Sequence, residues 1–217
     1  MELTKEQILQ IETFLERRKF DYVDLKYEIL DHIISDIEQK VETGISFNDA
    51  FETTTLKWKK TFEESFSFYF GAMYFAPKIV IEKAKKVYKN YFILIVASYF
   101  LPLIFFSYVD FSLSKEYQYY FNNVLQVLSI LLVLINLIFM SKKKKINVKT
   151  TYSFILRTQN SSILLGAILI LTNSYFRGDS SINTIAVGLF LCFAFTSLLY
   201  VKMYKKHREV SKKYKTL

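Results

Sequence analysis

The stretch of sequence that decides the fold is Lys142-Lys143-Lys144-Lys145. An apolar hairpin ends directly before these four lysines, and a second apolar hairpin begins soon after them. Clusters of lysine mark the cytoplasmic ends of membrane-spanning helices, as the positive-inside rule describes. The pattern therefore predicts an all-α protein in which a basic cytoplasmic segment joins two transmembrane hairpins.

Four apolar segments around this basic segment are long enough to cross a bilayer. The first, residues 91–109, gives about 28 Å of helix at about 1.5 Å per residue, close to the thickness of the hydrocarbon core. Pro102 is expected to kink it. We predict a four-helix transmembrane domain over residues 91–201, with spans at about 91–109, 124–140, 158–175 and 183–201.

The distribution of lysine and arginine predicts the orientation. Lys149 and Arg157 extend the central basic segment, and residues 202–217 form a basic tail, whereas the two loops on the other side are short and nearly neutral. Both termini are therefore expected in the cytoplasm. The chain begins without a basic region followed by an apolar one, so we expect no cleavable signal peptide.

The charges divide the chain into two contrasting parts. Residues 1–76 carry 9 basic and 15 acidic residues, a net charge of −6, whereas residues 77–217 carry 20 and 5, a net charge of +15. Because the positive residues flank apolar runs, the expected partner is the lipid bilayer and not nucleic acid. The single cysteine, Cys192, excludes an intramolecular disulfide and a metal site built from cysteines.

Residues 1–61 are predicted to form a cytoplasmic three-helix module. Thr4 and Gln7 make a capping-box pattern ahead of a helix expected over residues 5–18. Apolar residues recur behind it at helical spacing and should share one small core. In the second helix this apolar stripe consists of Leu25, Ile29, Ile33, Ile37 and Val41.

The second and third helices of the module carry their own start and stop signals. Asp21 is expected to cap the second helix, and Gly44 to end it. Ser46 is expected to cap the third helix. The predicted apolar side of the third helix consists of Phe47, Ala50, Phe51, Thr54 and Trp58.

The second and third helices of the module share a pattern of seven residues, which are Glu28, His32, Asp36, Gly44, Ser46, Asp49 and Ala50. With this pattern, the stretch from Asp24 to Phe51 resembles the small helical module of the permease-prefix or HAAS type, which precedes bacterial membrane permeases and sensors. The resemblance implies a cytoplasmic regulatory or interaction element without chemistry of its own, and a place in a bacterial inner membrane. The third helix departs from the usual Leu-Gly ending, since the chain has Leu56-Lys57-Trp58 there.

Residues 62–90 are predicted to connect the module to the membrane. The first part is dense in phenylalanine and tyrosine around Gly71, and the second part carries five lysines after Pro77. Aromatic side chains of this density beside a membrane commonly lie at the headgroup level. They are equally suited to packing the module onto the next helix, and both interpretations stay open at this point.

One row of polar residues in the module has the spacing of a metal site. Glu28, His32 and Asp36 lie at positions i, i+4 and i+8, so their side chains share one helix face. A structural zinc site needs four ligands, however, and the only other histidine is His207 in the basic tail. We therefore expect no metal, and expect His32 to lie at the edge of the module core or to contact a carboxylate.

Polar residues also line one side of the predicted spans. Side chains of this kind on an apolar helix serve helix–helix packing, and this is the expected role here. A polar pathway is the alternative, although no Asp, Glu, Lys or His lies deep in a span. The possible polar transmembrane face consists of Gln126, Ser129, Asn136, Gln159 and Asn173.

No pattern for catalysis is present in the sequence. With 5 glycines in the chain, no glycine-rich phosphate loop can be assembled, and the nucleophile-elbow and zinc-protease patterns are absent. We expect no enzymatic activity and no cofactor. The sequence favours an integral membrane protein whose module binds a cytoplasmic or membrane protein partner, with self-association of the helical bundle. An oligomeric channel or an accessory subunit of a transporter or exporter is the alternative.

Overall fold

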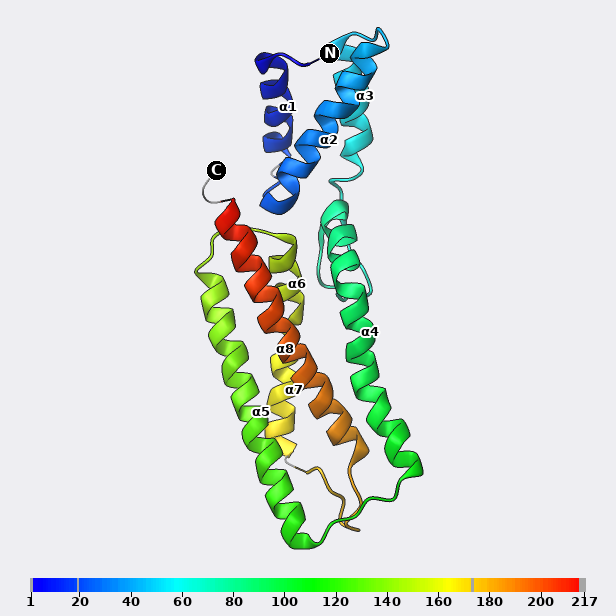
Figure 1. Ribbon diagram of the computed structural model, residues 1–217, viewed down its shortest axis with the longest axis vertical. Helices are drawn as coiled ribbons and strands as arrows, with labels where there is room; N and C mark the ends of the chain where they lie inside the picture. Colours follow the sequence, from blue (N-terminus) through cyan, green and yellow to red (C-terminus); the bar gives the residue numbers. More distant parts are fainter. Residues whose placement is uncertain (1, 19, 173, 215–217) are drawn as a thin grey trace. The chain divides into compact units, whose positions relative to one another are not determined.

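The computed structural model describes residues 2–18, 20–172 and 174–214 (Figure 1). The described residues are mainly helical, and they confirm the predicted all-α class, with three N-terminal helices ahead of apolar helices of membrane length. In chain order the elements are α1 (Lys5–Arg17), α2 (Val23–Glu42), α3 (Phe47–Lys59), β1 (Glu64–Ser65), β2 (Ala76–Pro77), α4 (Lys78–Tyr108), α5 (Lys115–Lys144), α6 (Thr151–Gln159), α7 (Ser162–Thr172) and α8 (Thr184–Lys213).

The contacts divide the chain into two compact units. The first unit consists of Met1–Val87, Asn147–Phe154 and His207–Leu217, and the second consists of Tyr88–Ile146 and Ile155–Lys206. The sequence-based ranges 1–61, 62–90, 91–201 and 202–217 follow the order of the chain. Each unit instead combines segments that are far apart in the sequence.

Helices α1, α2 and α3 bury one apolar face in common. The stripe of α2 is buried from Leu25 to Ile37, and it packs between α1 and α3. The capping box of α1 is confirmed, because the Thr4 side chain accepts from Gln7 and the Gln7 side chain accepts from the Thr4 backbone. Local sequence signals therefore suffice to form and position these helices.

The turn between α2 and α3 also follows its sequence signals. Gly44 has a φ of +92°, in the left-handed region that favours glycine. Its N–H donates to the Val41 carbonyl at 3.0 Å, and the next N–H, of Ile45, donates to the Lys40 carbonyl at 3.2 Å. This pair of bonds is the Schellman motif, and Ser46 then caps α3 by accepting from the Asp49 N–H.

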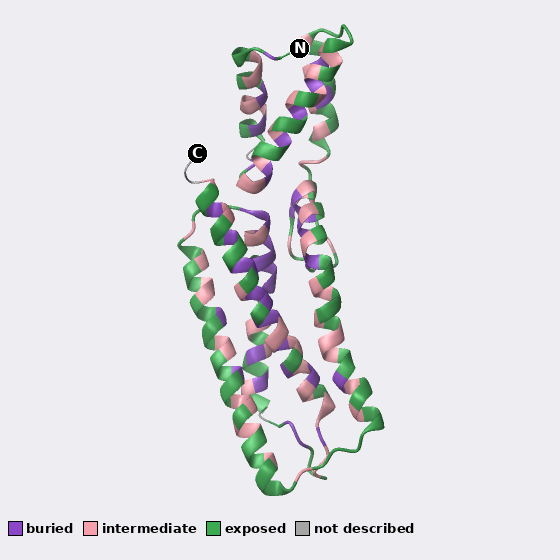
Figure 2. Cartoon of the chain, viewed as in Figure 1, coloured by how far each residue is buried: buried purple, intermediate pink, exposed green. Residues whose placement is uncertain are grey.

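Four helical segments of the described chain are long and apolar enough to cross a membrane. Their bounds are Lys78–Tyr108, Lys115–Lys144, Thr151–Thr172 and Thr184–Lys213. Much of their apolar surface is exposed on the protein, above all in α4 and α5, as the green colour of α5 in Figure 2 shows. These segments indicate a multi-pass integral membrane protein.

The helices extend beyond the predicted spans. Helix α6 begins at Thr151, ahead of the third predicted span, and α7 follows after a break at Asn160 and Ser161. Lys115, expected in a loop, opens helix α5. Helix α8 continues without interruption to Lys213, so most of the expected basic tail is helical.

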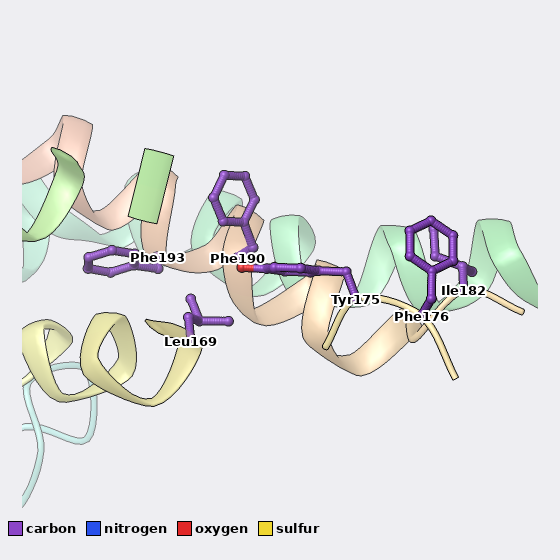
Figure 3. Close-up of a cluster of buried hydrophobic side chains, with 6 residues drawn as sticks. All are labelled: Leu169, Tyr175, Phe176, Ile182, Phe190 and Phe193. Carbon is purple, nitrogen blue, oxygen red and sulfur yellow. The ribbon is translucent and has the colours of Figure 1, made fainter. Parts of the chain in front are cut away.

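The core of the second unit lies between α5, α7, α8 and the loop that joins α7 to α8. Figure 3 shows its buried side chains, which are Leu169, Tyr175, Phe176, Ile182, Phe190 and Phe193. Two glycines allow close approach of the helices: a Cβ on Gly166 would lie 2.5 Å from the Phe193 ring, and one on Gly188 would lie 2.8 Å from the Tyr99 carbonyl oxygen. These two small residues therefore lie against neighbouring helices, as is typical of helix packing in membranes.

Candidate coupling site at the start of helix α6

The clearest polar site in the described chain lies where α6 begins, within the first unit. The backbone N–H of Thr151 lies 3.0 Å from each carboxylate oxygen of Asp24, a residue in the first turn of α2. The first N–H groups of a helix have no partner inside that helix, and they carry a partial positive charge. Asp24 thus caps α6 from a position 127 residues earlier in the chain.

The residues around Thr151 complete this cap locally. The Thr150 N–H donates to the Ser153 hydroxyl at 3.0 Å, and the Ser153 N–H donates to the Thr150 hydroxyl at 3.1 Å. This reciprocal pair has the form of a capping box. The start of α6 therefore uses a local cap and a distant carboxylate together.

A second connection runs parallel to the first. The Lys149 carbonyl accepts from the Val23 N–H at 3.1 Å, and the Lys149 ammonium lies 2.8 Å from the Asp21 carboxylate. The prediction that Asp21 caps α2 was therefore wrong: the N-cap is Tyr22, with no side-chain hydrogen bond, and Asp21 pairs with Lys149 instead. The ion pair is exposed, and pairs of this kind contribute about 0–1 kcal/mol.

The third connection comes from the end of α8. His207 is fully buried, and its Nδ1 lies 2.9 Å from the Thr150 hydroxyl and 3.3 Å from the Ser211 hydroxyl. One turn further on, the Tyr214 ring stacks on the Tyr27 ring of α2 at 5.2 Å. Sequence reasoning placed His207 in the basic tail and gave it no role. It is instead the buried contact between α8 and the segment before α6.

Asp24 has a perturbed carboxyl group. Burial raises the pKa of Asp24 above its usual value, while the hydrogen bonds from Thr151 and the charge of Lys83 act in the opposite direction. Lys83 itself is held by Glu28 of α2, with its Nζ 2.7 Å from the carboxylate. The site therefore joins α2, α4, α6 and α8 through charged and polar groups.

The two carboxylates of the row Glu28, His32 and Asp36, which was considered for a metal, each form an ion pair with a lysine. Glu28 pairs with Lys83 of α4, and Asp36 pairs with Lys57 of α3 at 3.1 Å. His32 lies exposed between them. Within the described ranges, no three histidine, cysteine or carboxylate side chains come together in a way that could hold a metal ion.

The polar residues of the apolar segments lie between helices of the second unit. Asn136 is fully buried and donates to the Ser197 hydroxyl of α8 at 2.7 Å, and the Ser129 hydroxyl lies 3.4 Å from that of Tyr175. Gln126 donates to the Ile170 carbonyl of α7 at 3.5 Å, and Gln159 donates to the Tyr88 hydroxyl at 2.9 Å. The remaining member, Asn173, lies outside the described residues.

Sequence reasoning missed Asp24, Thr150 and His207 as members of one site. The local signal that was available is the Thr-x-x-Ser spacing of Thr150 and Ser153, which is typical of a helix start. Neither Asp24 nor His207 carries a comparable local signal, because their partners are distant in the sequence. Comparisons of the chain with family models, with curated proteins and with solved structures find no match.

Proposed function

We propose that this integral membrane protein is a non-enzymatic regulatory or partner-binding element. Its N-terminal module, helices α1 to α3, binds a protein partner in the cytoplasm, and the apolar helices anchor the module in a bacterial inner membrane. The bound state of the module is passed to α6 and α8 through Asp24, Lys149 and His207. Both termini lie in the cytoplasm, and the helical bundle self-associates.

The observation that carries this proposal is the pair of hydrogen bonds from the Thr151 N–H to Asp24. A module that served only as a tethered binding domain would need no contact with the start of a membrane-length helix. Here Asp24, in the first turn of α2, caps α6, so a displacement of α2 removes that cap. Loss of a helix cap costs about 0.5–2 kcal/mol, enough to bias an element with two arrangements.

The composition of the contact supports a reversible connection. Three of its contacts lie at the surface, and they pair Asp21 with Lys149, Glu28 with Lys83, and Tyr27 with Tyr214. The first two are ion pairs, which are weak at the surface and are screened by salt. The resemblance to permease-prefix modules and the acidic character of residues 1–76 favour a basic protein surface as the partner.

The coupling is tested by hydrogen–deuterium exchange on the full chain in a mild detergent. Asp24→Ala should increase exchange at the backbone amides of residues 151–154, because α6 loses its distant cap. Asp31→Ala, on an exposed position of the same helix, is the matched control and should leave these amides unchanged. Equal exchange in the wild type and Asp24→Ala would contradict the coupling.

Partner binding is tested separately by affinity purification. The wild-type chain and a chain of residues 62–217 are each captured from the cells that produce the protein, and the co-purified proteins are compared. A partner that depends on residues 1–61 supports the proposal. A set of co-purified proteins that is the same for both chains would contradict it.

The channel or transporter-subunit hypothesis stays a prediction with less structural support. Ser129 and Asn136, the most buried members of the polar row, form hydrogen bonds between helices of one chain. Replacing both by leucine in reconstituted liposomes and measuring ion flux tests this alternative, since a conducting pathway lined by them should change its rate.

A further inference from the structure

The segment between β1 and β2, residues 66–75, forms a closed loop that we call the aromatic loop. Its ends are joined because Ser65 pairs with Ala76 and Glu64 pairs with Pro77 in an antiparallel register. The Lys78 N–H also donates to the Glu63 carbonyl at 2.9 Å. A loop of this length with adjacent ends is an Ω-loop, a form that often has a function.

Two rings fix the aromatic loop to the first unit. Phe70 is buried and packs edge-on against Phe154 of α6, with the ring centres 5.2 Å apart. The ammonium of Lys85, two turns into α4, lies 5.5 Å from the centre of the Tyr69 ring. One part of the loop therefore packs against α6 and α4.

The other part of the aromatic loop is turned to the outside. Phe68 is 87% exposed and Met73 is 86% exposed, and Phe66 and Phe75 are exposed as well. No charged residue occurs between Ser65 and Ala76. Exposed groups of large apolar side chains mark interaction sites, since a water-facing loop gains nothing from them.

The position of Lys85 places the loop near the membrane boundary. Lys85 precedes Tyr91, the expected start of the first apolar span, by six residues of the continuous helix α4. Six residues correspond to about 9 Å along the helix, and the headgroup layer is about 5–8 Å thick on each side of the hydrocarbon. Lys85 and its exposed neighbour Lys86 thus lie at the outer edge of the headgroup layer, where their long side chains reach lipid phosphates.

We propose that the aromatic loop inserts into the headgroup layer of the bilayer that α4 crosses. Phe68 and Met73 reach the boundary with the acyl chains, and Lys85 and Lys86 face the phosphates of anionic lipids. Aromatic and long apolar side chains are favoured at this depth because one end of the layer is apolar and the other is hydrated. The loop thereby fixes the start of α4, and with it the first unit, against the membrane surface.

The proposal is tested with tryptophan as a depth reporter in the full chain. The chain has one tryptophan, Trp58, so a Trp58→Phe background removes the native signal. Phe68→Trp is then reconstituted in phosphatidylglycerol vesicles that carry a nitroxide either at a shallow or at a deep acyl position. Leu56→Trp, at a 58% exposed apolar position on α3, is the matched control.

The expected result is a shift of the Phe68→Trp emission to shorter wavelength and a loss of emission that is greater with the shallow nitroxide. The Leu56→Trp emission should stay at long wavelength and lose little intensity with either nitroxide. If the lipid nitroxides quench Phe68→Trp and Leu56→Trp equally weakly, the proposal is overturned. A Phe68→Trp emission that is shifted but not quenched by lipid would also overturn it, because a protein surface then covers the loop.

A second measurement does not depend on tryptophan. In a Cys192→Ser background, Met73→Cys carries a nitroxide side chain, and its collisions with oxygen and with a water-soluble nickel chelate are compared by electron paramagnetic resonance. Insertion predicts that oxygen collides more often than the nickel complex at residue 73, and the reverse at residue 56 in Leu56→Cys. If the same reagent collides more often with the nitroxide at residue 73 and at residue 56, the proposal is overturned.

Discussion

Helices α2 and α5, one from each unit, bury opposite kinds of side chain. In the N-terminal module, Ile29, Ile33 and Ile37 of α2 are buried, whereas Asp31, His32 and Gln39 of the same helix are exposed. In the second unit, Ser129 and Asn136 of α5 are buried, whereas its leucines and isoleucines, such as Leu131, Leu134 and Ile138, are exposed. Each helix is amphipathic, but α2 exposes its polar side, whereas α5 exposes its apolar side.

The difference identifies the solvent of each unit. Water favours polar groups on the surface of α2, so the apolar stripe is driven inward. Around α5 the hydrophobic effect cannot separate leucine from lipid, so packing of small residues and hydrogen bonds between helices decide which side faces inward. The comparison can be tested by substitutions that are expected to be severe in one unit and mild at a similar position in the other.

The largest expected effect is that of Ile33→Ala in the module. Removing a fully buried isoleucine side chain costs about 2–5 kcal/mol of unfolding free energy, because transfer energy is lost and a cavity is left. Hydrogen exchange of the full chain should show lower protection across α2 and α3. Leu134→Ala removes a similar side chain from the exposed side of α5, and it should leave protection in α5 nearly unchanged. Similar losses in both helices would contradict the inside-out comparison.

The next effect concerns close packing in the second unit. Gly166→Val introduces a Cβ at 2.5 Å from the Phe193 ring and 2.6 Å from the Val133 side chain, so α7 must move away from α5 and α8. Overpacking of this kind costs about 1–3 kcal/mol. The melting temperature of the full chain in detergent should fall. Gly178→Val is the control, since no other atom lies within 4 Å of the added Cβ, and its melting temperature should stay close to that of the wild type.

A smaller effect is expected for the hydrogen bond between Asn136 and Ser197. Cross-helix bonds in apolar surroundings contribute about 0.6 kcal/mol on average. Among the described atoms, Asn136 Oδ1 is buried without a hydrogen-bond partner, so Asn136→Leu also removes an unfavourable group. A double-mutant cycle with Ser197→Ala isolates the pair. A coupling energy of zero would show that the contact serves packing alone.

Much of the fold could be predicted from local sequence. The capping box at Thr4, the left-handed turn at Gly44 and the apolar stripe of α2 are all interactions within a few residues, and the structure confirms them. The number of membrane-length helices followed from the apolar runs, because a span requires about 20 apolar residues in a row.

The site around α6 could not be predicted because its partners are not local. The apolar pattern placed the start of the third span at about Thr158, shortly before the apolar run that begins at Ile163. The helix instead begins at Thr151, since Asp24 supplies a cap from a distant segment. Likewise, residues 202–217 were predicted only as a basic tail, whereas α8 continues to Lys213 and His207 and Tyr214 contact distant segments. Such contacts have no periodicity and no motif along the chain.

The last prediction concerns the pH dependence of stability at one carboxyl group from each unit, Asp24 and Asp179. The two dependences are expected to have opposite signs. Burial raises the pKa of Asp24, so the folded first unit binds a proton more readily than the unfolded chain. Its contribution to stability is therefore fully present below the ordinary carboxyl pKa of 3.8, and it is lost as the pH rises through the raised pKa. Hydrogen bonds from Ser181 lower the pKa of Asp179, in the loop between α7 and α8, so its contribution is present at neutral pH and falls as the pH decreases.

These two dependences are separated by measuring local protection factors in the wild type, Asp24→Asn and Asp179→Asn over the same pH series. The difference between the wild type and Asp24→Asn at residues 151–154 should decrease as the pH rises. The difference between the wild type and Asp179→Asn at residues 180–182 should increase. Two slopes of the same sign would mean that burial does not dominate at Asp24, and that the cap of α6 is as accessible to water as the loop of Asp179.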